Sequence, residues 1–361
     1  MNWKKKVLST VTATAVGLSL TLGTPAVTEA AGVGDAAIIL AQGWALNKQI
    51  DANLKHFNDT EEGRQELYQK FREKYGVCED YEYNTALDRI MTNLTRGVGA
   101  VDPTISKKPY LYFISNQETV NAACSMGHVM MVNVGTFRKI TNEDELAAIV
   151  GHEMGHGQKD HVAKGQKKHL NKLVVASLAG AAVGGGALTS IVADVVLNNS
   201  IAHGDRKLES EADLLGFDYI LHTDYNPGAC AAVMQKFVEM EIGKNNSSIF
   251  NPSDHPDSAT RRDTYVKKLF EYSGKHVTAK DGVVTVNKKT LLKVAASADM
   301  SSAERSYFVL GNLAAAYHNG QNKYEATVQN GVVMLGNQPI IEPLAGDESA
   351  QVIADRLNEI K

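Results

Sequence analysis

The chain is poor in the residues that identify several common classes of protein. Only three of its 361 residues are cysteines, at positions 78, 124 and 230, and no Cys-x-x-Cys pair is present, so the cysteines make no zinc site by themselves. They allow either one disulfide with one free thiol or three free thiols. The formal net charge is only −4, so the chain lacks the basic footprint of a nucleic-acid-binding protein, and no nucleic-acid partner is expected.

Long uncharged segments are also scarce, and the first lies at the N-terminus. Three lysines at 4–6 precede an uncharged run over 7–23, and small residues at 28–30 suit cleavage near Ala30. This pattern predicts a signal peptide over residues 1–30 and a periplasmic or secreted mature protein. A retained membrane helix is the alternative. The segment contains no cysteine, which excludes lipid anchoring at a signal-peptide cysteine.

The second such segment, residues 173–197, is long enough to span a bilayer. Three consecutive glycines at 184–186 and Asp194 near its end favour two short helices joined by a turn, packed closely or covering a cleft. Contact with a membrane is the alternative, because glycine is commoner in membrane helices than in soluble ones.

The first half of the mature chain predicts helices followed by strands. Apolar residues recur at three- and four-residue steps over 35–75 and again over 81–94, where a helix is expected to end in a loop at 97–103. The segments 109–114 and 128–134 are rich in strand-forming residues. We expect the strand over 128–134 either to lie in the core or to form a sheet edge, where its backbone would hold an extended polypeptide.

The chemistry is concentrated in Gly151-His152-Glu153-Met154-Gly155-His156. Two histidines four positions apart lie one helical turn above each other, so both imidazoles reach one metal ion at about 2.0–2.1 Å. Glu153 lies close enough to contact a water held by that metal. The His-Glu-x-x-His pattern therefore predicts two zinc ligands and the general base of a metalloprotease, on a helix that begins at a capping box of Asn142 and Glu145.

A third histidine, His161, is expected on a different face of that helix, five residues beyond His156. In the long metzincin motif the third histidine stands six residues past the second, with a glycine at plus three. Here those positions are Val162 and Lys159, so the metzincin class is disfavoured.

The third ligand is expected from a second helix over 206–221. Glu209 and Asp213 lie four positions apart on one face of it. Glu209 completes a His-His-Glu set that leaves a fourth position for water, and Asp213 is placed to accept a hydrogen bond from a ligand histidine. Glu211 is expected to point elsewhere. The alternative for all three acids is a solvated helix face.

Residues 80 to 270 resemble the M48 family of zinc metallopeptidases, and the branch without several membrane spans is the better match. The resemblance rests on four motifs in chain order: Asn121-Ala122 before Gly127 and a strand; His-Glu-x-x-His; Glu209-Ser210-Glu211-Ala212-Asp213; and His255-Pro256 with Arg261. It implies one zinc ion per chain with Glu209 as third ligand. It also implies a sheet edge near 128–134 for the substrate, and His255 and Arg261 beside the active site, where they would assist the oxyanion.

The C-terminal part has a different character. The segment 282–292 recurs as 331–341, each copy begins at a hairpin signal, Asp281-Gly282 or Asn330-Gly331, and each ends in an amphipathic helix, over 302–317 or 349–360. This predicts a duplicated β-hairpin–helix unit. It has no cluster of metal-ligand or acid–base residues, so we assign it to binding or support.

Together these patterns predict an α+β, mainly helical protein. A zincin-like peptidase domain with a small β-edge is expected over 31–272 and an accessory domain over 276–361. The predicted function is a zinc-dependent endopeptidase acting on misfolded or unassembled envelope proteins. The alternative is an envelope chaperone or assembly factor with a latent metal site. The cleavage specificity and the oligomeric state do not follow from the sequence.

Overall fold

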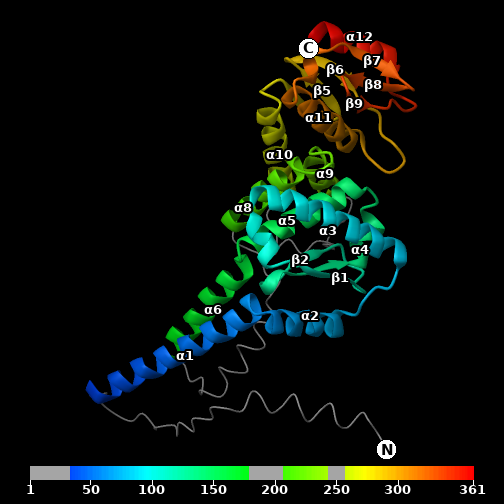
Figure 1. The fold of residues 1–361 in the computed structure, drawn as a ribbon. Coiled ribbons are helices and arrows are strands. Elements are labelled where there is room, and N and C mark those ends of the chain that lie inside the picture. The colour runs from blue at the N-terminus through cyan, green and yellow to red at the C-terminus, as the bar shows by residue number, and fades with distance from the viewer. Residues whose placement is uncertain (1–32, 179–205, 243–256) are drawn as a thin grey trace, which may run out of the picture.

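Helices carry most of the chain, and three small sheets of three strands each accompany them (Figure 1). The structure is a computed structural model that describes residues 33–178, 206–242 and 257–361. The α+β, mainly helical class is thereby confirmed. The predicted signal peptide, His255 and most of the apolar segment 173–197 lie outside the described residues.

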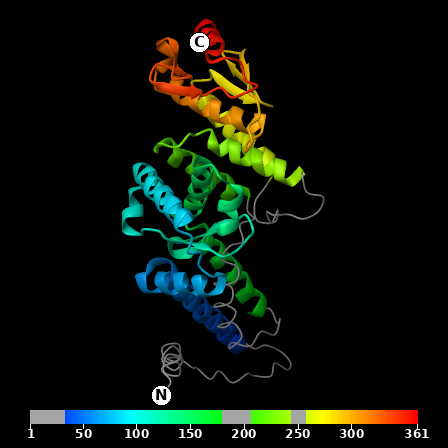
Figure 2. The ribbon, with the colours of Figure 1, turned by 90° about the vertical axis from the view of Figure 1, so that its right-hand side faces the viewer.

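Two N-terminal helices replace the helical region predicted over 35–75. Helix α1 spans Val33–Asp59 and α2 spans Glu61–Tyr75. The break falls at Thr60, whose extended backbone and side-chain oxygen cap α2 by accepting from the amide of Gly63. Helix α1 packs along α6 (His161–Leu178), and both point away from the rest of the molecule (Figures 1 and 2).

Helix α3 runs from Tyr81 to Val101, past the loop predicted over 97–103. Helix α3 continues through this segment because of a tertiary contact. A β-carbon at Gly97 would stand 2.5 Å from the carbonyl oxygen of Tyr219 on α8 (Arg206–Leu221), so this glycine lets the two helices touch rather than ending α3. A short 3₁₀ helix, Pro103–Lys107, follows.

The first sheet places the strand predicted over 128–134 at its centre, which corrects the expectation of an edge there. Strand β3 (Val129–Asn133) pairs in parallel with β1 (Leu111–Ser115) and antiparallel with β2 (Ala122–Cys124). All five residues of β3 are buried, as expected of a strand that is apolar on both faces. The outer strand on the β2 side is thus Ala122–Cys124, which contacts α5.

Helix α5 (Glu143–Gln158) lies in the middle of the molecule, after the short helix α4 (Val134–Lys139). It packs against α8 and α9 (Ala229–Ile242), and α9 packs in turn against α10 (Ser258–Tyr272). One hydrophobic cluster runs from α3 through α5 and α9 into the C-terminal sheets.

The C-terminal copies each contain three strands and a helix. The first has β4 (Val277–Lys280), β5 (Val283–Val286), β6 (Lys289–Lys293) and α11 (Ser302–His318). The second has β7 (Ala326–Gln329), β8 (Val332–Leu335), β9 (Gln338–Ile341) and α12 (Ala350–Ile360). Both predicted hairpin turns are present, with positive φ at Asp281-Gly282 and Asn330-Gly331.

The C-terminal copies are interlocked. Helix α11 packs on β4 and β9, and α12 packs on β7 and β6, so each helix touches both sheets. Helix α11 also packs on α9 and α10, which joins these copies to the helices around α5. They lie at the opposite end of the molecule from α1 and α6 (Figures 1 and 2). The boundaries drawn at 272 and 276 stay predictions.

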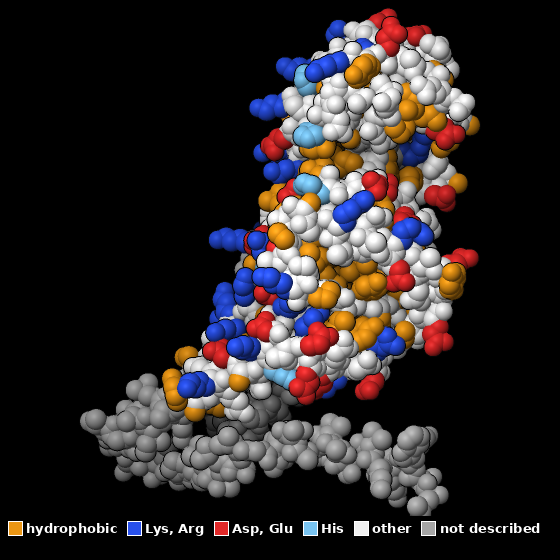
Figure 3. All heavy atoms as spheres, viewed as in Figure 1, with side chains coloured by type: hydrophobic (Ala, Val, Ile, Leu, Met, Phe, Trp, Pro, Cys, Tyr) orange, Lys and Arg blue, Asp and Glu red, His pale blue; other side chains and the backbone are white. Residues whose placement is uncertain are grey.

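Acidic and basic side chains are interspersed on the face shown in Figure 3. None of the helices in the described part of the chain has the length and hydropathy needed to cross a membrane. Cys78, Cys124 and Cys230 are all free thiols, which decides the question of pairing that the sequence left open.

Candidate metal centre

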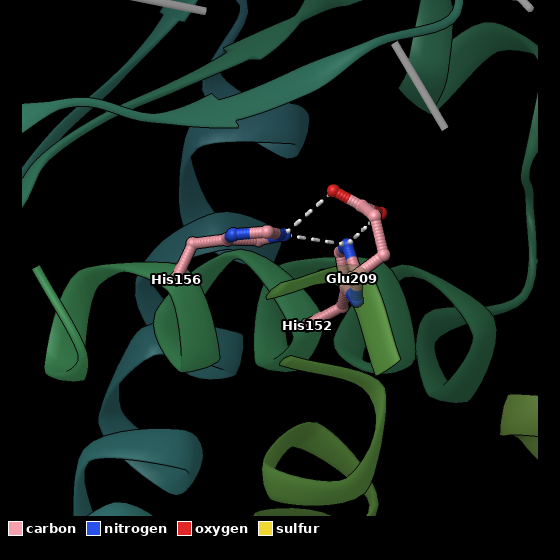
Figure 4. A group of neighbouring side chains, drawn as sticks. All are labelled: His152, His156 and Glu209. Carbon is pink, nitrogen blue, oxygen red and sulfur yellow. Dashed lines mark hydrogen bonds and ion pairs between the residues drawn. The ribbon is translucent and has the colours of Figure 1, made fainter. Parts of the chain in front are cut away.

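Helix α5 holds His152, Glu153 and His156 in a buried position. The helix begins where predicted, with the Asn142 side chain accepting from the amide of Glu145 at 3.1 Å. His152 and His156 are 4% and 1% exposed, so their imidazole nitrogens depend on neighbouring protein groups rather than bulk water. Figure 4 shows both rings pointing toward Glu209.

Glycines bring α5 and α8 close enough for Glu209 to reach the two histidines. A β-carbon at Gly155 would stand 2.8 Å from the carbonyl oxygen of Ala212, and one at Gly216 would stand 2.8 Å from the amide nitrogen of His152. Both contacts are with backbone atoms, which have little room to yield. The two missing side chains therefore set the spacing of the helices.

The donor atoms of His152, His156 and Glu209 have the spacing of zinc ligands. The two Nε2 atoms are 3.2 Å apart, His156 Nε2 is 3.3 Å from Glu209 Oε1, and His152 Nε2 is 3.5 Å from Glu209 Oε2. A tetrahedral ion with bonds of about 2.0–2.1 Å has an edge of about 3.3–3.4 Å between ligands. Among the described residues, this trio is the group that could hold a metal ion.

Behind His152 lies a buried charged network. His152 Nδ1 is 2.8 Å from Asp213 Oδ1, which also accepts from Arg261 Nη2 at 2.6 Å and from the Tyr265 hydroxyl at 2.8 Å. Burial acts to raise the pKa of Asp213, but the Arg261 charge and the His152 hydrogen bond outweigh it and lower the pKa far below its usual range. Asp213 is therefore an ionised acceptor that keeps a proton of His152 on Nδ1, while Nε2 faces Glu209 and His156.

The same network controls the basicity of His152. Burial and the charge of Arg261 act to lower its pKa, but hydrogen bonds to Asp213 and Glu209 prevail and raise it to about 9. A cation that binds Nε2 must compete with a proton held this strongly.

Behind His156 lies a second pair, which the sequence reasoning missed. His156 Nδ1 is 2.9 Å from His161 Nδ1, and His161 Nε2 is 3.3 Å from Glu211 Oε2. Glu211 points away from the three donor atoms, as expected, but it contacts the histidine that supports His156. His161 belongs to α6 rather than α5, because the chain turns at Asp160, which has φ of +50°. The sequence does not predict the turn at Asp160, so the only indication of this pair in the sequence was the presence of a histidine at position 161.

Glu153 is held by the edge strand. Its Oε2 accepts from the amide of Cys124 at 3.0 Å, and its Oε1 lies 3.9 Å from His152 Nε2. The carboxylate thus stands between β2 and the donor atoms of the site, within reach of a water molecule placed there.

A mainly apolar pocket adjoins Glu153 and His152. Its floor and walls come from β2, α5, α9 and α10, and the apolar side chains of α9 dominate one wall. The apolar lining residues are Ala122, Ala148, Ile149, Cys230, Val233, Met234 and Phe237.

Two further residues, Arg261 and His255, were predicted to lie beside the active site. Arg261 lies beside the site and lines the pocket, but its guanidinium contacts Asp213 and the outer nitrogen of His152, at 3.2 Å, rather than the side where Glu153 stands. These contacts hold Asp213 and His152 in place, and the oxyanion role expected of Arg261 stays a prediction. His255, expected on the loop before α10, lies outside the described residues.

A helix that carries His-Glu-x-x-His and a second helix that adds a glutamate define the metallopeptidase class of site. The chain belongs to peptidase family M48, whose family model matches residues 83–267. The match begins in α3 and ends in α10, so it covers every element that builds the site.

Three relatives illustrate the range of the similarity. Metalloprotease LoiP of Escherichia coli is 30% identical over 173 residues, which cover 46% of this chain and 66% of that protein. The beta-barrel assembly-enhancing protease of Escherichia coli is 22% identical over 143 residues, 37% of this chain and 29% of that one. The mitochondrial metalloendopeptidase OMA1 of Arabidopsis thaliana is 28% identical over 155 residues, 41% and 29% respectively. The chain thus spans less than two thirds of each relative.

Proposed function

We propose that this protein is a zinc-dependent endopeptidase that hydrolyses peptide bonds of misfolded or unassembled proteins of the cell envelope. The observation that carries the proposal is the convergence of His152, His156 and Glu209 beside the carboxylate of Glu153. With the three donors found among the described residues, a tetrahedral zinc ion would have a fourth position for water or substrate, as a catalytic site requires. When bound there, zinc supplies a Lewis acid that lowers the pKa of a water ligand toward neutrality.

Glu153 is the general base of the proposed reaction. It accepts a proton from the attacking water and then delivers it to the leaving amide nitrogen. The hydrogen bond from the Cys124 amide holds one carboxylate oxygen, which leaves the other directed toward His152 and the site. The base is therefore oriented by the backbone of β2 before any substrate arrives.

The substrate would be held as an added strand on β2 rather than on β3. Asn133 donates to the carbonyl of Asn121 and Ser125 donates to the carbonyl of Val129, so residues 121 and 125 face β3. In antiparallel pairing the residues between them alternate, so the amide and carbonyl of Ala122 point to the opposite side. An extended peptide pairing there would pass Glu153.

The pocket suggests the kind of residue that flanks the scissile bond. Its wall of Val233, Met234 and Phe237 would bury an apolar side chain, which contributes about 1.5–3 kcal/mol of binding. Such side chains are exposed in unfolded proteins. The names of the two bacterial relatives, a metalloprotease and a beta-barrel assembly-enhancing protease, support a proteolytic role in the envelope.

The test is Glu153→Gln, measured for zinc content and for cleavage of casein and of a peptide series that varies one residue beside the scissile bond. We expect unchanged zinc, a loss of turnover of about 10²–10⁴-fold, and a wild-type preference for apolar residues. Exposed Glu82 on α3 offers the matched control, Glu82→Gln, which should cleave normally. Normal cleavage by Glu153→Gln would refute the mechanism.

A chaperone or assembly factor with a latent metal site is the second candidate. It is favoured by the docking of α11 on α9, which places the C-terminal copies against the helix that forms the pocket wall. If Glu153→Gln loses proteolysis but still suppresses aggregation of an unfolded envelope protein as wild type does, the chaperone role stands. If both activities are lost together, the peptidase accounts for the function.

A further inference from the structure

His161 and Glu211 lie on the far side of His156 from the metal-binding atoms. His156 Nε2 faces Glu209 and His152, so its other nitrogen, Nδ1, is the one that meets His161 at 2.9 Å. The two rings meet edge to face, with centroids 5.0 Å apart and planes at 76°. This geometry directs the Nδ1 of one ring at the Nδ1 of the other.

We propose that His161, held by Glu211, is a positioning residue that fixes the tautomer and ring orientation of His156 for metal binding. This inference rests on the proposed zinc site. A histidine that binds a metal through Nε2 carries its proton on Nδ1, and that proton needs an acceptor when the ring is buried. His161 Nδ1 is that acceptor. Its own proton is then on Nε2, which donates to Glu211 Oε2 at 3.3 Å.

The arrangement gives the two ligand histidines different supports from one helix. His152 donates directly to Asp213, whereas His156 reaches Glu211 through an intervening imidazole. Glu209, Glu211 and Asp213 follow one another at two-residue steps on α8, so this helix supplies one ligand and the carboxylate behind each histidine.

The difference in burial between His161 and Glu211 predicts which of the two contributes more to metal binding. The side chain of His161 is only 2% exposed, whereas that of Glu211 is 47% exposed and also lies 3.9 Å from Lys159 Nζ. Water can replace the half-exposed Glu211 as an acceptor for His161, whereas His156 is buried and its Nδ1 contacts the buried His161 directly. Loss of His161 should therefore weaken metal binding far more than loss of Glu211.

The experiment compares side chains that keep or lose the acceptor at the Nδ1 position. The asparagine amide oxygen can occupy the place of histidine Nδ1, whereas phenylalanine fills the volume with no acceptor. Zinc affinity of the full chain is measured by competition with a chromophoric chelator, and the ligand field of the cobalt-substituted protein by its visible spectrum. His161→Phe should lower zinc affinity about 10–100-fold and change the cobalt spectrum. His161→Asn should stay within a few-fold of wild type, and Glu211→Ala should fall between the two.

The controls separate this inference from the proposed function. The exposed His222, at the end of α8, gives His222→Phe, which should bind zinc normally. If wild type binds no zinc, the proposed function fails. If wild type binds zinc and His161→Phe binds it equally well, or His161→Asn is as impaired as His161→Phe, the positioning role is refuted. Should His161→Phe fail to fold by circular dichroism, His161→Gln, whose amide lies at the Nε2 position instead, replaces it.

Discussion

Gly155 on α5 and Ala212 on α8 lie so close that a β-carbon on the glycine would stand 2.8 Å from the alanine carbonyl oxygen. We predict that Gly155→Ala pushes α8 away from α5, lowers stability by about 1–3 kcal/mol and weakens zinc binding, because Glu209 moves with α8. Chemical denaturation and chelator competition measure the two effects.

Gly165 on α6 provides the control for this prediction, because a β-carbon there meets nothing within 4 Å. Gly165→Ala should leave zinc affinity unchanged and add up to about 1 kcal/mol of stability, through helix propensity. Equal zinc affinity in both variants would contradict the argument that the close approach of the helices sets the site.

The charge behind His152 is predicted to matter through Asp213. Arg261→Met leaves the Asp213 carboxylate buried without its guanidinium partner, which should cost about 3–5 kcal/mol of stability and reduce zinc affinity. Thermal unfolding and zinc titration measure the effect. The neighbouring Arg262 pairs with Asp263 near the surface, so Arg262→Met should change stability by less than about 1 kcal/mol. Similar losses of stability and zinc affinity in the two variants would show that the ion pair between Arg261 and Asp213 has no special role.

A buried cluster between α5, α9 and α11 is predicted to make stability depend on pH. Lys236 Nζ is 2.6 Å from Glu145 Oε2 and 2.9 Å from Glu304 Oε1. Burial raises the pKa of Glu145, the Glu304 carboxylate raises it further, and Lys236 opposes both. The folded state therefore retains a proton that the unfolded chain releases above about pH 4.3.

The sign follows from that difference. Because the folded state binds more protons, the free energy of unfolding falls as pH rises from about 4.3 through the raised pKa, by up to about 1.4 kcal/mol per pH unit. Glu304→Gln removes the competing carboxylate and should flatten the dependence, whereas the exposed Glu325→Gln should not. Urea denaturation between pH 5 and 9 measures how the free energy of unfolding depends on pH. A wild-type stability that rises with pH across this range would show that the folded state does not retain this proton.

The edge of β2 yields a prediction about substrate binding. Proline is tolerated on an edge strand where the lost N–H faces outward, as that of Ala122 does. Ala122→Pro should therefore raise KM or abolish cleavage while zinc content and melting temperature stay near wild type. Ala123 faces β3, so Ala123→Pro should instead lower the melting temperature. Unimpaired cleavage by Ala122→Pro would exclude strand addition at this edge.

The sequence was most informative where the pattern is local. The four-residue step between His152 and His156 and that between Glu209 and Asp213 define helix faces, so these side chains could be assigned before any fold was known. Helix α8 also runs over the predicted residues, Arg206–Leu221.

The sequence was least informative about contacts between segments that lie far apart along the chain. The order β1-β3-β2 depends on pairing across the chain, and although Val129–Asn133 is apolar on both faces, the segment alone does not say which neighbour covers each edge. The turn at Asp160 that returns His161 to His156 has no comparable local signature, and the glycine at 97 indicates a loop until α8 is seen against it.

The spacing of acids on α8 has a consequence for how the metal is gained and lost. A slide of α8 by one residue, about 1.5 Å along its axis, would withdraw Glu209, Glu211 and Asp213 together from the two histidines. In the proposed zinc-bound enzyme the ion would crosslink α5 and α8, so that binding of the metal and packing of α8 against α5 would be coupled. Chelation should accordingly accelerate hydrogen exchange along α8 as a unit, rather than at residue 209 alone.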